Sequence, residues 1–333
     1  MLDIQRLQRI RLSRRPLAQR AVGQLLRLNY GLLPGVPIEF EHAERIPAQP
    51  VIYAMNHTDR YNYFPFQVYI WQHFDRFTAT WVKGKYYENP LLATFMEKTN
   101  QLPTVSRGYI ITKDFVSALQ RKPTSAEYEA LRRWVDSAAV PDARPDQPPP
   151  DALPEALLST NRNVLGYAFD SAKEDYASYI NAIFRIMMKE FVVLNEAAIG
   201  TGLDILIFPQ GTRATRLLPG KIGISQMALH SRLPIVPIGC NGSDRVYPGG
   251  SPFGKKGHII YRVGEPIPYT EYGAFHSGDA FEPFSPQAET QHRDAFERVA
   301  GLITQRIDGL LDDRYRRSRD EESDATRETE RFI

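Results

Sequence analysis

The stretch PVIYAMNHTDRYN, residues 50–62, most constrains the fold, because an apolar run stops there abruptly at a polar turn that contains His57. β-Branched and aromatic residues after a proline predict a strand over residues 51–55. The aromatic and apolar pattern of residues 61–74 predicts a covered helix with Pro65 near its start. His57 is therefore expected at the edge of a parallel α/β sheet, where ligands bind. By itself, such a position is also typical of a polar capping residue.

A second apolar run ends in the same way, in the stretch DILIFPQGTRATR at residues 204–216. Gly211 lets the backbone approach a ligand closely, Thr212 offers a hydroxyl group, and Arg213 presents a planar fork of donors that suits phosphate or carboxylate. The pattern predicts a second strand that ends in an anion-binding turn. A surface salt bridge is an equally good interpretation of Arg213 from these residues alone.

Together, NHTDRYN and FPQGTR resemble the first and third motifs of the glycerolipid acyltransferase family, which includes lysophosphatidic acid and glycerol-3-phosphate acyltransferases. The stretch at residues 83–108, which contains Arg107, is similar to the second motif, and LPIVPI at residues 233–238 is similar to the fourth. The motifs follow one another in the family's order. The resemblance implies an α/β fold in which helices cover a mostly parallel central sheet.

Two residues depart from the family pattern, because Asn62 and Gln210 stand where the motifs have Asp and Glu. In the family, the aspartate is taken to orient the histidine and to favour its protonated form. An asparagine can accept a hydrogen bond from the imidazole and fix its tautomer, but it supplies no charge. Asp59 is expected either to supply that charge to His57 or to begin the following helix together with Thr58.

The resemblance implies acyl transfer from acyl-CoA or an acyl carrier protein to a hydroxyl of lysophosphatidic acid or a related glycerolipid, in phospholipid biosynthesis. His57 would be the general base, with Asn62 and Asp59 as its catalytic neighbours. Arg107 and Arg213 would hold the phosphate of the acceptor. A helix N-terminus near Gly223 would add anion affinity. The substrate-binding residues expected from these motifs are Arg107, Gln210, Gly211, Thr212, Arg213 and Lys221.

Two alternatives remain open at this stage. The exchange of both acids for amides is compatible with a catalytically idle protein that binds lipid or acyl carrier for a partner. A working enzyme could instead acylate a lipid that lacks a phosphate. No cofactor or metal is expected, because a thioester is already activated and no histidine or cysteine cluster has the spacing of metal ligands. Acyl chain length, donor carrier, acceptor headgroup and oligomeric state are not predicted.

The first 35 residues carry a concentrated positive charge, with the arginines balanced only by Asp3. Leucine and isoleucine recur among them at helical intervals, and Pro16 separates two predicted short helices. Such a basic amphipathic segment can lie on an anionic membrane surface or can pack on the domain, and the two interpretations are compatible. The expected location is cytoplasmic, peripheral on the inner face of the membrane. The arginines are Arg6, Arg9, Arg11, Arg14, Arg15, Arg20 and Arg27.

The remainder is expected to divide into an acyltransferase-like α/β domain at residues 36–270 and a C-terminal loop, helix and charged tail at residues 271–333. An insertion is predicted at about residues 115–195. It contains a polar helix, a proline-rich linker and a long helix. The long helix carries a stripe of Met and Phe residues, which either lines a tunnel for the acyl chain or packs in the core. The C-terminal helix is placed at residues 287–311, and a strand is placed before Lys83.

Composition excludes several other classes of protein. The formal net charge is only +2, and no aromatic-basic motif of a nucleic-acid binder is present. Cys240 is the sole cysteine, so an internal disulfide is impossible. No run of about 20 apolar residues predicts a membrane-spanning helix. Lys83 and Lys85 follow a predicted strand and could each attract a phosphate or be solvated surface.

Overall fold

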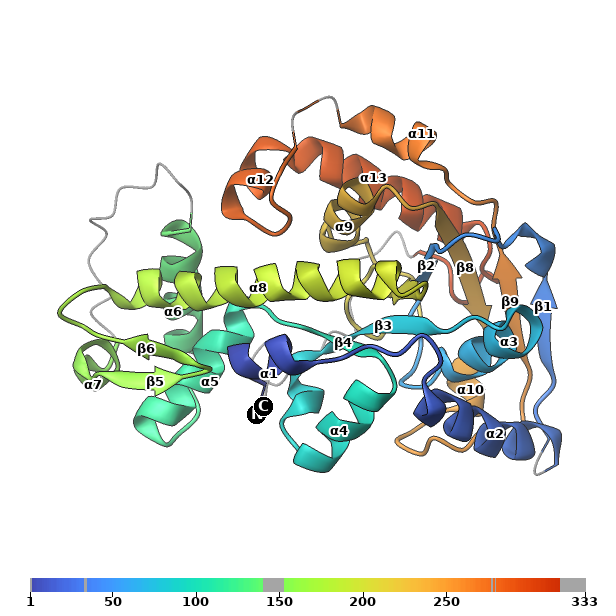
Figure 1. The fold of residues 1–333 in the computed structure, drawn as a ribbon, viewed down its shortest axis with the longest axis horizontal. Coiled ribbons are helices and arrows are strands. Elements are labelled where there is room, and N and C mark those ends of the chain that lie inside the picture. Colours follow the sequence, from blue (N-terminus) through green and yellow to red (C-terminus); the bar gives the residue numbers. More distant parts are fainter. Residues whose placement is uncertain (1, 33–34, 140–152, 277, 279, 318–333) are drawn as a thin grey trace.

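The computed structural model describes residues 2–32, 35–139, 153–276, 278 and 280–317, and a seven-stranded sheet forms its centre (Figure 1). The strand order is β1-β9-β8-β2-β7-β3-β4. All neighbours are parallel except β8 and β9, which are antiparallel, so the predicted α/β class with a mostly parallel sheet is confirmed. The strands are β1 Ile38–Glu41, β2 Ile52–Met55, β3 Thr78–Lys83, β4 Gln101–Thr104, β7 Asp204–Ile207, β8 Ile235–Asn241 and β9 Ile259–Val263.

Strand β2 lies between β7 and β8 and is fully buried, as a central parallel strand with helices on both faces requires. Its residues alternate between two hydrophobic clusters. Ile52 and Ala54 belong to the cluster beneath α8, α9 and α13, whereas Tyr53 and Met55 belong to the cluster beneath α2 and α3 (Figure 1). These helices are α2 Leu17–Gly31, α3 Phe64–Phe74, α8 Tyr176–Gly200, α9 Gly223–Ser231 and α13 Arg293–Asp308.

The predicted pair of N-terminal helices is present, but its two members are placed differently. In α1 (Ile4–Arg9), Ile4 and Leu7 are buried in the main core, where the helix packs against α8. Helix α2 begins after Pro16 and buries one apolar stripe on α3 while it exposes a second one to solvent. The packed interpretation therefore holds for α1, and only α2 retains an exposed apolar face.

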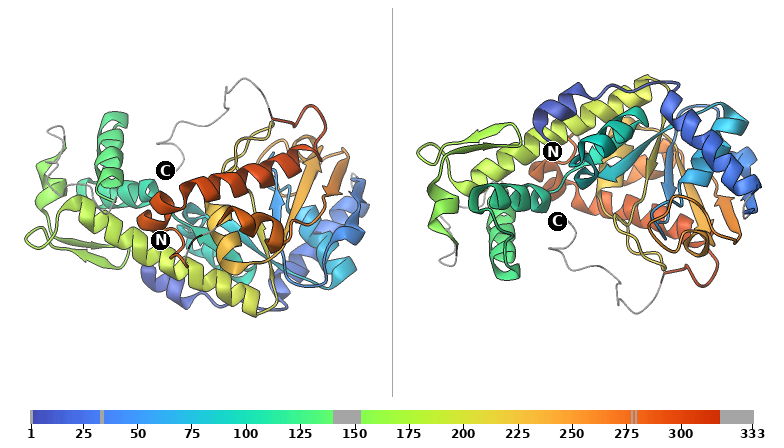
Figure 2. Two further views of the ribbon diagram at one scale, coloured as in Figure 1. Left: turned by 90° about the horizontal axis from the view of Figure 1, so that it is seen from above. Right: turned by 90° about the horizontal axis from the view of Figure 1, so that it is seen from below.

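The segment between β4 and β7 forms one end of the molecule, and β1 with α2 forms the other (Figure 2). It begins with α5 (Arg107–Leu119) and α6 (Ser125–Ser137) and continues after α7 (Glu155–Ser159) with an antiparallel hairpin of β5 (Arg162–Val164) and β6 (Tyr167–Phe169). This hairpin was not predicted from the sequence, because strands of three residues are too short to show an alternation of apolar and polar side chains. The proline-rich linker predicted at residues 141–154 lies mostly outside the described residues.

Two helix boundaries predicted from sequence are wrong. Helix α3 begins at Phe64 rather than at Thr58 or Asp59, because the turn after β2 continues through Tyr63. The single C-terminal helix is instead α12 (Pro286–Gln291) followed by α13, with His292 between them in a non-helical conformation. Ser285 and Pro286 start a separate short helix, in which the Ser285 side chain accepts a hydrogen bond from Ala288 N. The charged tail from residue 318 onward lies outside the described residues.

The remaining elements are short helices in the connections between and after the strands. Helix α4 (Pro90–Lys98) joins β3 to β4, and α10 (Ser243–Val246) follows β8. Helix α11 (Tyr269–Tyr272) follows β9 and leads toward α12. Three single-turn helices complete the described chain: η1 at Ala43–Arg45, η2 at Gly84–Tyr87 and η3 at Gly273–Phe275.

Candidate active site

His57 lies two residues beyond β2, at the carboxyl edge of the sheet, as the sequence predicted. Strands β2 and β7 are neighbours in register, with Ala54 beside Ile207, so the residues that follow each strand also meet. The His57 ring consequently stacks on Phe208, with ring centroids 4.0 Å apart and 19° between the planes. Tyr63 packs edge to face against Phe208, at a centroid distance of 6.0 Å. Phe208 thus supports the imidazole, and Tyr63 supports Phe208.

Asn62 fixes the tautomer of His57. Its Oδ1 lies 3.2 Å from His57 Nδ1, and its Nδ2 donates to Asn56 O at 2.7 Å. Because the amide nitrogen is used on a carbonyl, the amide oxygen faces the ring and must accept a proton from Nδ1. The other ring nitrogen, Nε2, then keeps its lone pair. Asn62 is fully buried, and its own carbonyl accepts from Tyr261 Oη at 2.5 Å, which holds the residue in place.

The surroundings keep the imidazole neutral. Burial lowers the pKa of His57 from 6.5 to about 3, the hydrogen bond that its Nδ1 donates to Asn62 raises the pKa in part, and the charges of Arg213 and Lys83 lower it further. A histidine with a lowered pKa is unprotonated at neutral pH, and the lone pair of Nε2 can accept a proton. The asparagine therefore orients the ring as the family's aspartate does, and the imidazolium receives no compensating charge from it.

Asp59 has a different place from either of the two that the sequence suggested. Its Oδ1 accepts from Tyr61 N at 2.8 Å and its Oδ2 from Thr58 Oγ1 at 2.9 Å, so the carboxylate closes the turn after β2. Burial raises its pKa. The Nδ1 of His57 already donates a hydrogen bond to Asn62. The following helix begins only at Phe64. Asp59 thus shapes the turn that carries His57, and it neither begins that helix nor bonds to the imidazole.

Gln210 ties the two motif turns together. Its Oε1 accepts from His57 N at 3.2 Å, while its Nε2 donates to Thr212 O at 3.0 Å and to His57 O at 3.4 Å. Ala214 N donates to the same His57 carbonyl at 2.9 Å. A glutamate could accept the first bond but could not donate the other two. The amide at this buried position is therefore matched to its partners, which is the physical reason why Gln fits this turn.

A pocket of about 790 Å³ opens beside His57. Gly211 adopts a left-handed conformation, with φ of +69°, and the next two residues, Thr212 and Arg213, line the pocket as predicted. Its other cationic residues come from the turn after His57 and from the end of β3. They are Arg60, Lys83 and Lys85. The wall toward α2 and α4 is apolar and includes Val22, Leu25, Leu26, Leu92, Phe95 and Met96.

Arg107 is not brought to this pocket. It is the first residue of α5 and turns away toward α8, where its Nε donates to Asn181 Oδ1 at 2.8 Å and its guanidinium lies 4.3 Å from the centre of the Phe184 ring. The side chain is buried, and burial lowers its pKa. The expectation that Arg107 and Arg213 share one phosphate is therefore not met in this structure, because packing against α8 decides where Arg107 points.

Lys221 does not line the pocket, but it lies behind Gly211, which does: a Cβ atom at Gly211 would be 3.6 Å from Lys221 Cγ. The residue is exposed, and its backbone N donates to Pro209 O at 2.8 Å. Helix α9 does begin two residues later, at Gly223, as the sequence suggested. Among the residues that the structure describes, no group of His, Cys, Asp or Glu side chains lies together as metal ligands. Within the same ranges, no helix is long and apolar enough to cross a membrane.

The known proteins that match this chain include two acyltransferases, and no family model matches the chain. The 1-acyl-sn-glycerol-3-phosphate acyltransferase of Cocos nucifera is 47% identical over 49 residues, which are 14% of this chain and 16% of that protein. The chain resembles the glycerolipid acyltransferases. The solved 1-acyl-sn-glycerophosphate (LPA) acyltransferase PlsC of Thermotoga maritima matches with a TM-score of 0.40 and 13% identity, over 88% of this chain and 79% of that one.

Sequence reasoning missed several residues of the pocket. Phe208 was visible as the aromatic residue that ends the second apolar run, but a stack on His57 needs the register of β2 and β7. Arg60 gave no signal of its own. Lys83 and Lys85 had been named as groups that attract a phosphate or are solvated surface, and the adjacency of β3 to β7 is what places them at the same edge as His57. Trp81 of β3 also lines the pocket, and its Nε1 donates to Asn195 Oδ1 of α8 at 2.8 Å.

Proposed function

We propose that this chain is an O-acyltransferase that moves a fatty acyl group from acyl-CoA or an acyl carrier protein to a hydroxyl of lysophosphatidic acid or a related glycerolipid, in phospholipid biosynthesis. The observation that carries the proposal is the oriented pair of His57 and Asn62 at the wall of a pocket with cationic residues and an apolar side. The family motifs quoted above and the 47% identity over 49 residues support the choice of reaction.

In this reaction, Nε2 of His57 takes the proton of the acceptor hydroxyl while that oxygen attacks the thioester carbonyl. The tetrahedral intermediate collapses with loss of the thiolate, which receives the proton from the imidazolium. A positioned base of this kind contributes about 10²- to 10⁴-fold to the rate. No cofactor takes part in these steps. Because Asn62 adds no charge, the imidazolium is short-lived, and proton return to the leaving thiolate is strongly favoured.

The loop after β7 supplies the groups that would hold charge. Arg213 lines the pocket, and none of the residues in the described ranges forms an ion pair with it. Its guanidinium suits the phosphate of the acceptor, together with Lys85 and Arg60 on the pocket wall. The Gly211 amide already donates to Phe208 O at 3.0 Å, so the amides of Thr212 and Arg213 are the better candidates to stabilise the oxyanion.

The acyl chain would lie along the apolar wall that α2 and α4 provide. Both helices expose large apolar side chains on the outside of the same pocket. Leu17, Leu28 and Leu32 of the α2 segment are 75%, 59% and 69% exposed, and Leu91 of α4 is 83% exposed. Phe253, which also lines the pocket, is 49% exposed and is followed by exposed Lys255 and Lys256.

These side chains support a peripheral location on the inner, cytoplasmic face of the membrane, with the pocket open toward the lipid. Helix α2 carries Arg20 and Arg27 and no acidic residue, which favours anionic lipid. The double variant Leu28→Ser and Leu32→Ser should reduce sedimentation with anionic vesicles, and buried Leu7→Ala in α1 is the control for general destabilisation. Equal loss of vesicle binding in both variants would argue against the α2 surface.

The proposed activity is tested by mass spectrometry of products. Purified protein and its His57→Ala variant receive a mixture of lysophospholipids and glycerol-3-phosphate with several acyl-CoAs and acyl carrier proteins. New acylated lipid that disappears in the variant supports the proposal and identifies the acceptor. His258→Ala is the matched control, since that histidine is 45% exposed at the ion pair with Glu39. A folded wild-type protein without product would favour the idle, lipid-binding alternative instead.

A further inference from the structure

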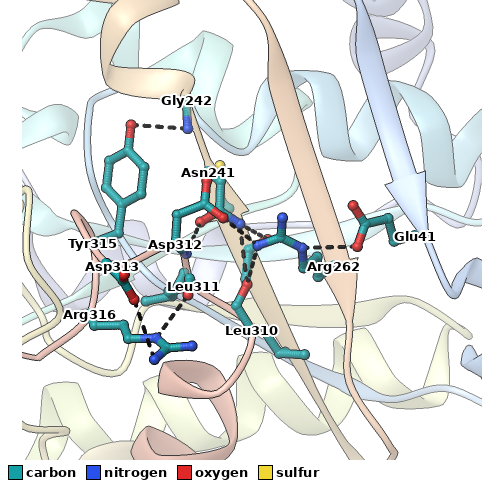
Figure 3. Close-up of polar contacts among 12 residues, drawn as sticks. Glu41, Asn241, Gly242, Arg262, Leu310, Leu311, Asp312, Asp313, Tyr315 and Arg316 are labelled. Atoms are coloured by element: carbon teal, nitrogen blue, oxygen red, sulfur yellow. Dashed lines mark hydrogen bonds and ion pairs between the residues drawn. The ribbon is translucent and has the colours of Figure 1, made fainter.

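The chain turns sharply after α13 and passes over the ends of β8 and β9 (Figure 3). We call residues 310–316 the C-terminal clasp. Its first turns follow directly from the helix, with hydrogen bonds from Leu310 N to Ile307 O at 2.9 Å and from Tyr315 N to Asp312 O at 2.8 Å. Neither the family motifs nor the proposed catalytic steps involve these residues. The contacts on their two sides nevertheless connect the sheet to the loop that carries Arg213.

On one side, the clasp is bound to the sheet by a buried amide and a guanidinium. Asn241, the last residue of β8, donates from Nδ2 to Leu310 O at 3.2 Å and accepts from Asp312 N at 2.8 Å through Oδ1. Arg262 of β9 donates from Nη1 to the same Leu310 carbonyl at 3.1 Å and to Asp312 Oδ1 at 2.7 Å, while its Nε pairs with Glu41 at 2.9 Å (Figure 3).

The fit between the clasp and β8 leaves no spare room. A Cβ atom at Gly239 would lie 2.6 Å from Leu310 Cβ and 2.7 Å from Leu310 O. Such distances are shorter than van der Waals contact, so any larger residue at this position must push the clasp away from the sheet. Gly239 is thus required by close approach, and it offers a way to displace the clasp without a change in the clasp itself.

Tyr315 anchors the far end of the clasp. Its side chain is 3% exposed. The hydroxyl accepts from Gly242 N at 3.2 Å (Figure 3). It also donates to Asp244 Oδ1 at 2.7 Å. Asp244 Oδ2 also accepts from Arg314 at 2.9 Å. The ring and the hydroxyl together fix the backbone of Tyr315 beside the carboxyl end of β8.

On its other side, the clasp holds the loop after β7. Leu217 N donates to Tyr315 O at 2.9 Å, and Arg216 Nη1 reaches the carbonyls of Asp313 and Arg316 at 3.4 and 3.3 Å. At the other end of this short stretch, Ala214 N donates to His57 O at 2.9 Å. Residues 214–217, immediately after Arg213, are therefore fastened at both ends, to the histidine turn and to the clasp.

We propose that the C-terminal clasp positions Arg213 for the acceptor's phosphate, with Tyr315 as its positioning residue. The inference rests on the proposed function, in which Arg213 binds that phosphate. The stretch from Thr212 to Arg216 has no helix or strand of its own, so these few hydrogen bonds, with that of Gln210 to Thr212 O, fix the backbone from which the Arg213 side chain extends. Displacement of such a group by about 1 Å costs up to roughly 100-fold in rate.

The test compares Tyr315→Ala with Tyr315→Phe, which keeps the ring and removes only the two hydroxyl contacts. Hydrogen–deuterium exchange of the peptide that spans residues 211–218 should become faster in Tyr315→Ala and less so in Tyr315→Phe. In acylation assays with lysophosphatidic acid, Tyr315→Ala should raise KM about tenfold with a smaller change in kcat. The decisive control is the Arg213→Ala background, in which Tyr315→Ala should add almost nothing to KM.

Val299→Ala, in the buried face of α13, serves as the matched variant for lost stability, because this residue has no part in the clasp. Unchanged exchange in residues 211–218 of Tyr315→Ala, or fully additive effects with Arg213→Ala, would overturn the inference. Gly239→Ala gives a second route to the same displacement if Tyr315→Ala does not fold. If the wild-type protein acylates no lipid, the proposed function fails, and the exchange measurement still decides whether the clasp orders the loop.

Discussion

Two buried asparagines hold two basic side chains in this protein, and their comparison shows how one arrangement serves different ends. Asn62 presents Oδ1 to His57 while its Nδ2 bonds to Asn56 O, and Asn181 presents Oδ1 to Arg107 while its Nδ2 bonds to Val135 O at 2.8 Å. The amides are oriented in the same way. The partners differ, because imidazole can be neutral at pH 7 and guanidinium cannot.

This difference distinguishes a residue placed for catalysis, His57, from a residue that stabilises packing, Arg107. Next to the pocket, burial keeps His57 unprotonated, so the asparagine only needs to hold one tautomer. In the segment beneath α8, Arg107 stays charged and is stacked on Phe184, so its asparagine provides an acceptor for a cation that has left water. An arginine after a strand therefore does not by itself identify a ligand site.

Replacement of Asn62 by leucine should have the largest effect. Leucine has a similar volume but cannot fix the tautomer of His57, and it leaves Asn56 O without its donor. We expect kcat to fall about 100-fold, with KM for the lipid acceptor little changed, because only the base is affected. Steady-state kinetics on the folded variant measures this. An unchanged kcat would mean that Asn62 does not orient the base.

Replacement of Asn181 by alanine should destabilise the fold and leave the chemistry intact. The variant removes the acceptor of Arg107 Nε and the donor of Val135 O, and the loss of one hydrogen bond to a buried charged group costs about 1.5–3 kcal/mol. Asp136, which lies 3.9 Å from Arg107 Nη1, remains as its ion-pair partner. Urea unfolding gives the free-energy change, and kcat and KM at 25 °C should match the wild type. A large change in KM would return Arg107 to the list of acceptor ligands.

Replacement of Arg213 by alanine should produce the opposite pattern. Because no described residue forms an ion pair with Arg213, its loss should change the free energy of unfolding by less than about 0.5 kcal/mol. KM for a phosphate-bearing acceptor should rise about tenfold, as expected for one lost charged hydrogen bond. A lipid acceptor without phosphate should be unaffected. Equal losses with both acceptors would show that Arg213 acts on the acyl donor or on the transition state.

Replacement of Asn62 by aspartate should have the smallest effect at neutral pH and should show it most clearly in acid. In the wild type, the pKa of His57 is lowered to about 3, so the reactive neutral form persists from pH 8 down to pH 4. A carboxylate at residue 62 raises that pKa, and the acid limb of kcat/KM should move upward. A pH–rate profile between pH 4 and pH 8 measures the shift, and coincident profiles would contradict the environment assigned to His57.

The lowered pKa of His57 should also make the free energy of unfolding depend on pH. The folded-state pKa of His57 lies below its unfolded value of 6.5, so the unfolded chain binds a proton first as the pH falls. The contribution of His57 to the free energy of unfolding should therefore decrease between pH 6.5 and about pH 3. This loss should be smaller in the aspartate variant, because its folded-state pKa lies closer to the unfolded one.

Much of the sheet edge was predictable from the chain. Short apolar runs that stop at a polar turn predicted β2 and β7, and the structure places His57 and Arg213, which follow these strands, on the wall of one pocket. The interpretation that Asn62 fixes the tautomer of His57 came from the family resemblance, which has an aspartate at that place in the motif. Gln210 was placed in the binding turn, but its three hydrogen bonds to His57 and Thr212 require the register of β2 against β7.

Other features depended on long-range packing that no local pattern records. Helices α1 and α2 carry similar basic and apolar residues, yet α1 is covered by α8 and α2 keeps an exposed leucine stripe. Asp59 has the residue type of a helix start, and the turn after β2 uses it instead. The C-terminal clasp carries no motif in its sequence, and its connection to the site is visible only in its contacts with Arg216 and Leu217.

The sequence by itself determined the strands β2, β3 and β7 and which residues stand at their carboxyl ends, because alternation, turn residues and apolar runs act over a few neighbouring residues. The mostly parallel arrangement of the sheet was implied by the family resemblance. Only the tertiary structure decided which way Arg107 and Asp59 face and which segment supports Arg213. Side-chain direction follows from the free energy of burying each group against elements that are distant in sequence, such as α8 for Arg107 and the clasp for the Arg213 loop.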